Sequence, residues 1–369
     1  MVSMPIDDLS ALLHGAVVMA PMTKGSNLPY RRLCDELGAT ITMGEMALAR
    51  KLQKQSRPEY ALLRRHPSER VFGVQLAGRT EEEMAWAAAA AVERGADLVD
   101  VNMGCPIHEM TRRGLGSALL QKPRRIEGIV AAMKKAVDGA VPITVKIRLG
   151  WDEAKRVHRQ VARAAVAGGA DAITVHGRTK TARYRKAADW EAIGEVVSEV
   201  DVPVLGNGDI LFPHEIDAFR ARAGCAGVMT ARGALIKPWI FKEAADGAYW
   251  DITAEERLEI YGRYVDLAKE HWGEDEGGIR RLRGFLMWHL DFWYRYVPRR
   301  ADGEFPKLQE RDEPWVPRSE LEAVLSRPDP EAHAWIATRL LEGQDAAGPI
   351  PEAPSEEDLE GHRSAIPQG

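Results

Sequence analysis

The fold of this chain is decided by one stretch, Asp100-Val-Asn102-Met-Gly104-Cys105-Pro106, with Arg113-Gly114-Leu-Gly116-Ser-Ala-Leu119-Leu120 shortly after it. An apolar run that begins at Leu98 ends abruptly there in Asn, Gly, Cys and Pro. Buried strands of an α/β barrel end in this way, at the rim where chemistry is usually placed. A cysteine held between glycine and proline at such a rim can serve as a proton donor or a nucleophile. Because most free cysteines are small buried hydrophobes, the stretch alone leaves a structural role for Cys105 open.

Eight apolar, β-rich segments recur along the first two-thirds of the chain, at residues 16–22, 40–46, 71–77, 98–103, 143–149, 172–176, 203–206 and 227–231. Helical patterns separate most of them, for example at residues 80–94, 124–137, 155–167 and 189–200. This alternation predicts a (β/α)8 TIM barrel. A glycine also precedes the second, fourth, sixth and eighth segments, at positions 38, 95, 169 and 224. We expect each of these glycines to end a helix in the left-handed conformation.

The pattern changes after about Lys242, where residues 253–271 and 275–297 predict longer helices. The second carries aromatic residues at helical spacing, which we interpret as the core of a small all-helical domain rather than a base-stacking surface: Phe285, Trp288, Phe292 and Tyr296. Residues 318–342 predict one or two more helices. From Gly343 the Pro, Glu, Ser and Gly content predicts a disordered acidic tail. We therefore expect a barrel domain at 1–242, a helical domain at 243–342 and a tail at 343–369.

Composition narrows the class of protein. With 28% charged and 45% apolar residues, and no apolar run near the ~20 residues of a membrane span, the chain is typical of soluble proteins. The start of the sequence lacks the apolar core of a signal peptide. The 3 cysteines form no disulfide framework and no CxxC pair, so we expect a cytoplasmic protein. We also expect a monomer without a metal site.

The net charge of -5 is unevenly spread. Residues 1–300 hold 44 basic and 39 acidic side chains, whereas residues 301–369 hold 6 and 16. The basic residues cluster at 50–54, 64–65, 112–113, 122–125, 180–186, 280–283 and 299–300. Each cluster alone is typical of a solvated surface, but several share loops with the strand ends, which favours a polyanionic partner.

Polar residues follow the predicted strands and would converge on one mouth of a barrel. They are Ala20-Pro21-Met22-Thr23, Gln75, Asn102 and Cys105, Lys146, His176-Gly177-Arg178, Asn207-Gly208-Asp209 and Ala231-Arg232-Gly233. A lysine inside an apolar strand must face a ligand or a partner, so Lys146 either binds a ligand or pairs with Glu45 or Asp100.

Glycines after the seventh and eighth strands predict a phosphate site. Gly206, Gly208 and Gly233 lie in the loops that usually cradle a phosphate in this fold. A P-loop spacing is absent, and no GxGxxG follows the first strand. A phosphorylated flavin held by a lysine and a glutamine, with a cysteine as acid nearby, is one coherent interpretation.

Six motifs from about residue 16 to residue 241 resemble, in the same order, the tRNA-dihydrouridine synthase family. They are Ala-Pro-Met from residue 20, Asn-Met-Gly-Cys-Pro-Ile from 102 with Gly-Ser-Ala-Leu-Leu-Gln-Lys-Pro from 116, Lys-Ile-Arg-Leu-Gly from 146, His-Gly-Arg-Thr from 176, Gly-Asn-Gly-Asp-Ile from 206 and Thr-Ala-Arg-Gly-Ala from 230. Residues 237–241 and 271–273 are most similar to the eukaryotic subgroup that bears an N-terminal zinc finger, although we expect no such finger here.

The resemblance implies FMN as cofactor, NADPH as reductant and a uridine of tRNA as substrate, with the helical domain binding the tRNA. It assigns cofactor binding to Pro21, Met22, Thr23, Gln75, Lys146, His176, Asn207, Gly208, Asp209, Ala231 and Arg232. It makes Cys105 the general acid and gives uracil binding to Asn102 and Arg178. A thiol with a pKa near ~8.5 suits protonation of C5 after hydride reaches C6 of the base.

Two other functions remain open from the sequence. One is a free-pyrimidine flavoenzyme of the dihydroorotate dehydrogenase type, against which the helical domain and the basic loops argue. The other is a tRNA-binding or chaperone protein with a vestigial site, against which the intact Cys105, Lys146 and His176 argue.

Overall fold

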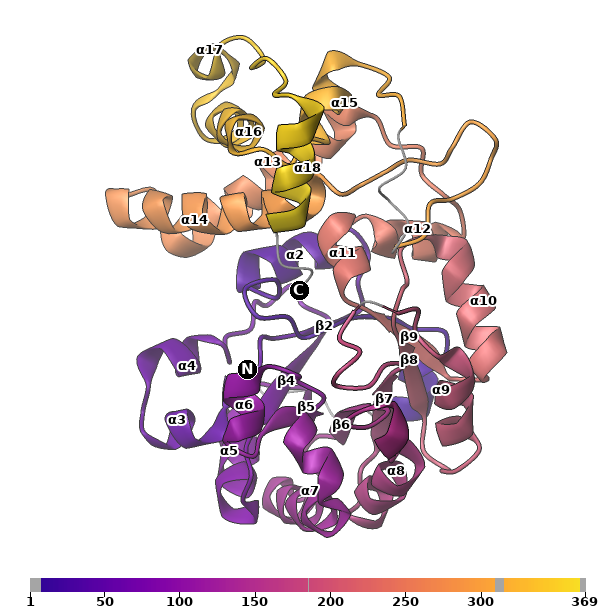
Figure 1. The fold of residues 1–369 in the computed structure, drawn as a ribbon. Helices are drawn as coiled ribbons and strands as arrows, with labels where there is room; N and C mark the ends of the chain where they lie inside the picture. Colours follow the sequence, from indigo (N-terminus) through magenta and orange to yellow (C-terminus); the bar gives the residue numbers. More distant parts are fainter. Residues whose placement is uncertain (1–7, 185, 309–314, 366–369) are drawn as a thin grey trace.

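Eight parallel strands close into a barrel in the structure, a computed structural model that describes residues 8–184, 186–308 and 315–365 (Figure 1). The strands are β1 (Val17–Met19), β2 (Ile41–Met43), β4 (Val71–Ala77), β5 (Leu98–Met103), β6 (Ile143–Arg148), β7 (Ala172–His176), β8 (Val204–Asn207) and β9 (Gly227–Thr230). β1 pairs with both β2 and β9, and β2 pairs with β4, so the ring has no free edge. The predicted (β/α)8 barrel is confirmed. The sequence did not predict the short β3 (Ala47–Leu48), which adds a second pairing to the end of β4.

Helices cover the outside of the barrel between the strands. They are α2 (Leu28–Glu36), α3 (Ala49–Gln53), α4 (Arg57–Ala61), α5 (Glu81–Glu93), α6 (His108–Arg112), α7 (Pro123–Val137), α8 (His158–Ala167), α9 (Trp190–Val197), α10 (Pro213–Ala223) and α11 (Arg232–Ile236), with α1 (Leu9–Leu13) preceding β1. Two 3-10 turns, η1 (Gly116–Gln121) and η2 (Glu153–Lys155), lie after β5 and β6. Local sequence explains where they begin, since Thr80 caps α5 and Pro123 occupies the first turn of α7.

The four glycines expected to end helices all do so in the left-handed region. Their φ angles are +104° at Gly38, +87° at Gly95, +94° at Gly169 and +67° at Gly224. A side chain is strained at these angles, so glycine lets the chain turn back toward the next strand.

The helical part follows α12 (Ile240–Asp246) and packs on the barrel beside α2 (Figure 1). It consists of α13 (Ala254–Trp272), α14 (Glu276–Trp293), α15 (Glu320–Leu325) and α16 (Pro330–Glu342). Trp293 stacks on Tyr261 with ring centres 4.0 Å apart, and Tyr30 of α2 stacks on His289 at 4.2 Å. The aromatic core therefore joins the barrel to the helices.

The predicted aromatic stripe of α14 lies partly at the edge of this core. Phe292 and Tyr296 are buried, but Phe285 and Trp288 are only half-buried. His289 and Trp293, one position further along the helix, occupy the centre instead. The predicted stripe, which was chosen by aromatic type alone, is therefore displaced by one residue from the buried face of the helix.

The structure differs from the predicted disordered tail. It has α17 (Gln344–Ala347) and α18 (Glu356–Ala365) there, while residues 366–369 lie outside the described part. Arg327 donates to the backbone carbonyls of Pro351 and Glu352, and the Trp335 indole donates to Gly348, so polar contacts hold the segment to α16. The assignment of separate functions to the three parts stays a prediction. In the described ranges, no helix has both the length and the apolarity to cross a membrane.

Candidate functional site

A series of hydrogen bonds runs from the interior of the barrel, between β4, β5 and β6, toward its mouth. The Thr144 hydroxyl and the Gln75 amide both donate to the Asp100 carboxylate, each at 2.7 Å. Asn102 donates to the Gln75 side-chain oxygen at 2.7 Å and accepts from the backbone N–H of Cys105 at 3.0 Å. Each hydrogen-bonded side chain fixes the orientation of the next, and together they position the loop that carries the Cys105 thiol.

Cys105 is half-buried, and its loop is held from several sides. The backbone carbonyl of Gly104 accepts from Arg148 Nε at 2.8 Å and from the Ser117 hydroxyl at 2.9 Å. Gly116 has a φ of +58°, and a Cβ there would lie 2.7 Å from the Cys105 carbonyl oxygen. Burial raises the pKa of the Cys105 thiol above its ordinary value, so the group keeps its proton at neutral pH. The geometry fits a proton donor better than a thiolate nucleophile.

Lys146 projects from β6 and meets a neutral partner. Its Nζ donates to the Asn207 side-chain oxygen at 2.8 Å. Within the described residues, neither Asp100 nor Glu45 lies in ion-pair range, and Glu45 instead accepts from the backbone N–H of Lys24. The sequence-based alternative of an ion pair is therefore wrong. Burial, with a smaller contribution from Arg148, lowers the pKa of Lys146 to about 7 against the attraction of Asp100.

The ends of β7, β8 and β9 form a cationic pocket. Arg178 Nη2 donates to both Asp209 oxygens at 2.5 and 2.6 Å, and Arg232 Nη2 donates at 3.3 Å. Two guanidinium groups thus outnumber the one carboxylate. The backbone N–H groups of Gly208, Arg232 and Gly233, which line the pocket, have no hydrogen-bond acceptor among the described residues. Unpaired N–H groups beside arginines form a donor set that suits a phosphate.

Two of the three predicted phosphate-loop glycines have another role. A Cβ at Gly206 would lie 2.1 Å from the Trp190 ring, and one at Gly233 would lie 1.9 Å from the Ile210 carbonyl oxygen. The close approach of protein atoms explains why these two positions are glycine. Gly233 nevertheless lines the pocket with its N–H group, whereas Gly206 is not among the described residues that line it. Gly208, with a φ of +136°, lines the pocket.

The two residues expected to bind uracil lie with different neighbours. Asn102 contacts Gln75 and the Cys105 loop, whereas Arg178 is bound to Asp209 and lies 3.3 Å from His176 Nε2. Burial, together with the surrounding cations, lowers the pKa of His176 well below its usual value, so this ring is neutral. Arg178 belongs by its contacts to the cationic pocket.

The other predicted cofactor residues lie on loops at the same mouth. Pro21, Met22 and Thr23 follow β1, where Met22 N–H donates to the Ser26 hydroxyl at 2.7 Å and that hydroxyl donates to the Ala20 carbonyl at 2.9 Å. Ala231 precedes α11 and lines the cationic pocket.

The sequence analysis missed Arg148 and Tyr184. Arg148 is buried, and besides Gly104 it reaches the Thr179 carbonyl at 3.1 Å. The Tyr184 ring lies 4.6 Å from the Arg232 guanidinium and 5.6 Å from that of Arg148. A period of two along β6 would have placed Arg148 on the same face as Lys146, so one of the two residues was predictable. Tyr184 comes from a loop, and no pattern indicated it.

The sequence profile described as Dihydrouridine synthase (Dus) matches residues 18–297. A Cryptococcus neoformans protein named tRNA-dihydrouridine(47) synthase [NAD(P)(+)] is 43% identical over 85% of this chain and 46% of its own length. A Coprinopsis cinerea protein of the same name is 40% identical over 92% of this chain and 51% of its own. A human protein, tRNA-dihydrouridine(47) synthase [NAD(P)(+)]-like, is 38% identical over 92% of this chain and 51% of its own length. The chain thus spans about half the length of the curated relatives it matches.

Among solved structures, histamine dehydrogenase from Rhizobium sp. 4-9 matches 68% of this chain and 48% of its own at a TM-score of 0.49 and 14% identity.

Proposed function

This chain belongs to the dihydrouridine synthase family, and from that premise we propose that it reduces a uridine of tRNA to dihydrouridine, with bound FMN and a reduced nicotinamide dinucleotide as electron donor. The observation that carries the proposal is the Cys105 thiol, kept protonated by burial at the barrel mouth that also holds Lys146. The names of the relatives specify position 47 of tRNA, and we extend that position to this chain.

The residues present fit a phosphorylated flavin at two points. Among the described residues, the Lys146 amine has the Asn207 amide oxygen as its one hydrogen-bond partner, so it can also donate to the electron-rich edge of a ring. Arg232 and the unpaired N–H groups of Gly208 and Gly233 can hold a phosphate, with Asp209 already neutralised by Arg178. When bound, the flavin supplies the hydride that C6 of uracil receives.

Cys105 supplies the proton. Addition of hydride at C6 leaves negative charge that an acid must neutralise at C5, and a protonated thiol can deliver Sγ–H to that carbon. The Asn102 amide oxygen and the Gly116 contact fix the backbone of Cys105, so the thiol is positioned before the substrate arrives. Asn102 also lies beside Cys105 and so can orient the base at the site of protonation.

The rest of the molecule fits a large polyanionic substrate. The basic cluster at 280–283 lies outside the barrel interior, and a free pyrimidine would not need it. We also propose that the protein acts in the cytoplasm, because the 3 cysteines Cys34, Cys105 and Cys225 are all free thiols.

The test combines absorption with product mapping. The purified protein should be yellow, and with NADPH it should form dihydrouridine at position 47 of an unmodified tRNA transcript, read as a stop in primer extension after alkaline treatment. A transcript with cytidine at position 47 is the control. A colourless protein that refuses added FMN, or one that reduces orotate but no tRNA, would contradict the proposal.

A further inference from the structure

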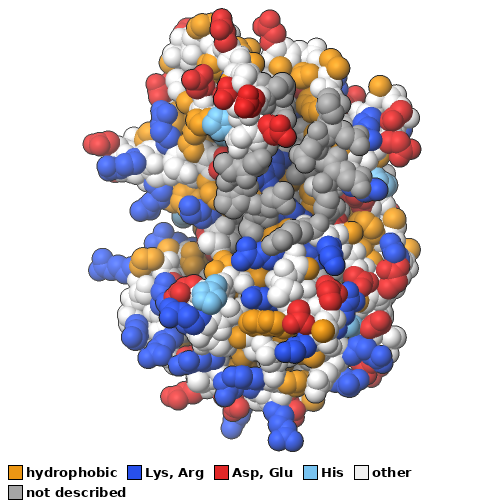
Figure 2. Space-filling view, viewed as in Figure 1, with side chains coloured by type: hydrophobic (Ala, Val, Ile, Leu, Met, Phe, Trp, Pro, Cys, Tyr) orange, Lys and Arg blue, Asp and Glu red, His pale blue; other side chains and the backbone are white. Residues whose placement is uncertain are grey.

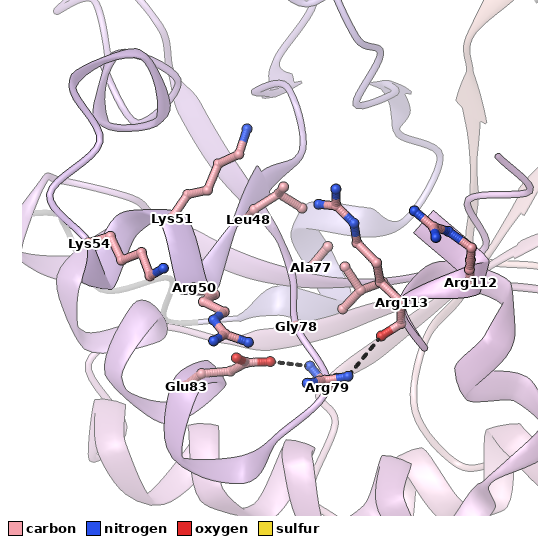
Figure 3. Close-up of a pocket in the computed structure, with 11 residues that line it drawn as sticks. Leu48, Arg50, Lys51, Lys54, Ala77, Gly78, Arg79, Glu83, Arg112 and Arg113 are labelled. Carbon is pink, nitrogen blue, oxygen red and sulfur yellow. Dashed lines mark hydrogen bonds between the residues drawn. The ribbon is translucent and has the colours of Figure 1, made fainter. Parts of the chain in front are cut away.

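A second hollow, which we name the basic cleft, opens beside the candidate active site (Figure 3). It encloses about 570 Å³ and is lined by residues from the β3–α3 and β4–α5 connections and from the loop around α6. Its apolar floor contains Leu48, Ala77 and Leu115. Around that floor stand Arg50, Lys51, Lys54, Arg79, Arg112 and Arg113.

The basic cleft adjoins the mouth of the barrel. Ala77 is two residues beyond Gln75 on the same face of β4, which places it ~7 Å further toward the rim. Leu48 is the register partner of Ala77, and Cys105 packs against the small apolar cluster to which Ala77 and Leu115 belong. A molecule whose ring lies near Gln75 and Cys105 can therefore extend its other end directly into the basic cleft.

Three of the six cations around the floor have a carboxylate partner. Arg112 and Arg113 pair with Glu109, and Lys51 lies 3.5 Å from Glu59.

Arg50, Lys54 and Arg79, in contrast, form no ion pair with any described residue, and all three are exposed. Glu83, the acidic residue of the lining, is already engaged as an acceptor for the backbone N–H groups of Arg79 and Thr80 (Figure 3). The basic cleft thus combines excess positive charge with an apolar floor, as a nucleotide site does.

We propose that the basic cleft binds the adenosine phosphates of the reduced nicotinamide dinucleotide and so directs its nicotinamide ring to the barrel mouth. This inference rests on the proposed function, because it names the site of the electron donor. Beyond Arg79 the chain enters the acidic first turn of α5, with Glu81 and Glu82 exposed. A short anion ends before these carboxylates, whereas a polynucleotide strand continuing in that direction would meet them.

Binding of adenosine 2′,5′-bisphosphate, measured by calorimetry, tests the site without catalysis. The triple variant Arg50→Gln, Lys54→Gln, Arg79→Gln should bind it about 10- to 100-fold more weakly, because charge-assisted hydrogen bonds to phosphate are lost. The matched control, Arg70→Gln, Arg94→Gln, Lys135→Gln, removes the same charge from exposed positions that form no ion pair with a described residue, at the opposite end of the barrel. It should bind like the unchanged protein. The single variant Lys54→Gln, from an exposed position, provides a milder change should the triple variant fold poorly.

Anaerobic flavin reduction provides a second readout. The apparent Kd for NADPH should rise in the cleft variant while the limiting rate of reduction and the affinity for tRNA stay unchanged. Equal binding of the bisphosphate by the cleft variant and the unchanged protein overturns the inference, as does equal loss in both triple variants. A loss confined to tRNA affinity also overturns it and makes the cleft an RNA site. Because the unchanged protein is assayed for FMN and dihydrouridine in parallel, failure of the proposed function is distinguished.

Discussion

Asp100 and Lys146 show how the barrel interior sets protonation at single residues. Burial raises the pKa of Asp100 to about 6, although Gln75 and Thr144 donate to it. The pKa of Lys146 falls to about 7. The two groups attract each other but do not pair, so neither cancels the cost of burying the other. An interior arranged in this way is suited to a ligand that can accept from the lysine.

Lys146→Met should separate stability from cofactor binding. The unfolded chain binds the lysine proton below about pH 10.4, whereas the folded apo-protein binds it only below about pH 7. The stability of the unchanged apo-protein therefore rises with pH through this window, and the methionine variant lacks that dependence. We expect the variant apo-protein to melt higher at pH 7, with the difference shrinking toward pH 10, and to retain little FMN. Scanning calorimetry at several pH values measures both Tm values, and equal Tm values for the variant and the unchanged apo-protein at pH 7 would contradict the prediction.

Cys105→Ala should retain flavin and tRNA binding but form dihydrouridine about 10²–10⁴-fold more slowly, because the positioned acid is lost. Cys105→Ser should recover little, since a hydroxyl is a far weaker acid. The buried Cys34 and Cys225 provide matched controls as Cys34→Ala and Cys225→Ala. Single-turnover oxidation of pre-reduced enzyme by tRNA is the measurement, and a rate equal to that of the unchanged protein would make Cys105 structural.

The strand–helix order was predictable from sequence because a parallel barrel buries both faces of every strand. Apolar-rich segments such as 98–103 and 172–176 coincide with β5 and β7. Cys105 and Lys146 stood out because their types are unusual at strand ends. The roles of Gly206 and Gly233 were not predictable, since their neighbours Trp190 and Ile210 come from other segments. Contacts between distant segments leave no local pattern.

At the level of one helix, α14 offers exposed arginines for tRNA. The sequence leaves two roles open for the basic cluster at 280–283, namely binding of tRNA or surface ion pairs with the nearby Glu274 and Glu276. The structure has neither glutamate as a partner in the described residues; Arg283 instead pairs with Glu342 of α16 at 2.6 Å. Arg280 and Arg281 remain exposed.

Arg280→Gln with Arg281→Gln should weaken tRNA binding and flatten its dependence on salt by about two phosphate contacts. Flavin reduction by NADPH should stay unchanged. Glu342→Gln, which removes the carboxylate opposite Arg283, is the control and should bind tRNA no more weakly. Filter binding between about 50 and about 200 mM salt, over which the Debye length falls roughly twofold, measures both slopes. An unaltered affinity in the double variant would show that this face of α14 does not meet the RNA.

For the whole molecule, aromatic and ionic contacts join the barrel to the helices. Tyr30 of the barrel stacks on His289, and Trp239 meets Tyr296 edge-on at 5.1 Å. Lys237 and Glu243, both fully buried, form an ion pair at the start of α12. Figure 2 shows basic side chains over much of the visible barrel face and acidic ones gathered at the far end of the helical part.

A chain ending after residue 242 should therefore not fold stably, because it exposes Tyr30 and Trp239 and leaves Lys237 buried without its carboxylate. The full chain should unfold in one transition. Calorimetry of both forms tests this, with a chain ending after Glu342 as the control that keeps the shared core. Two separate transitions in the full chain, or a monomeric and folded barrel fragment, would contradict it.

The unpaired ammonium of Lys146 has a consequence for the abundance of the protein in a cell. A buried amine without a carboxylate partner among the described residues destabilises the ligand-free folded form, which is then the form that unfolds and is degraded most often. Any ligand that binds only the folded state protects it in proportion to the ligand's concentration. The steady-state amount of this protein in the cell should then rise and fall with the supply of the vitamin from which FMN is made, even while transcription of its gene stays constant.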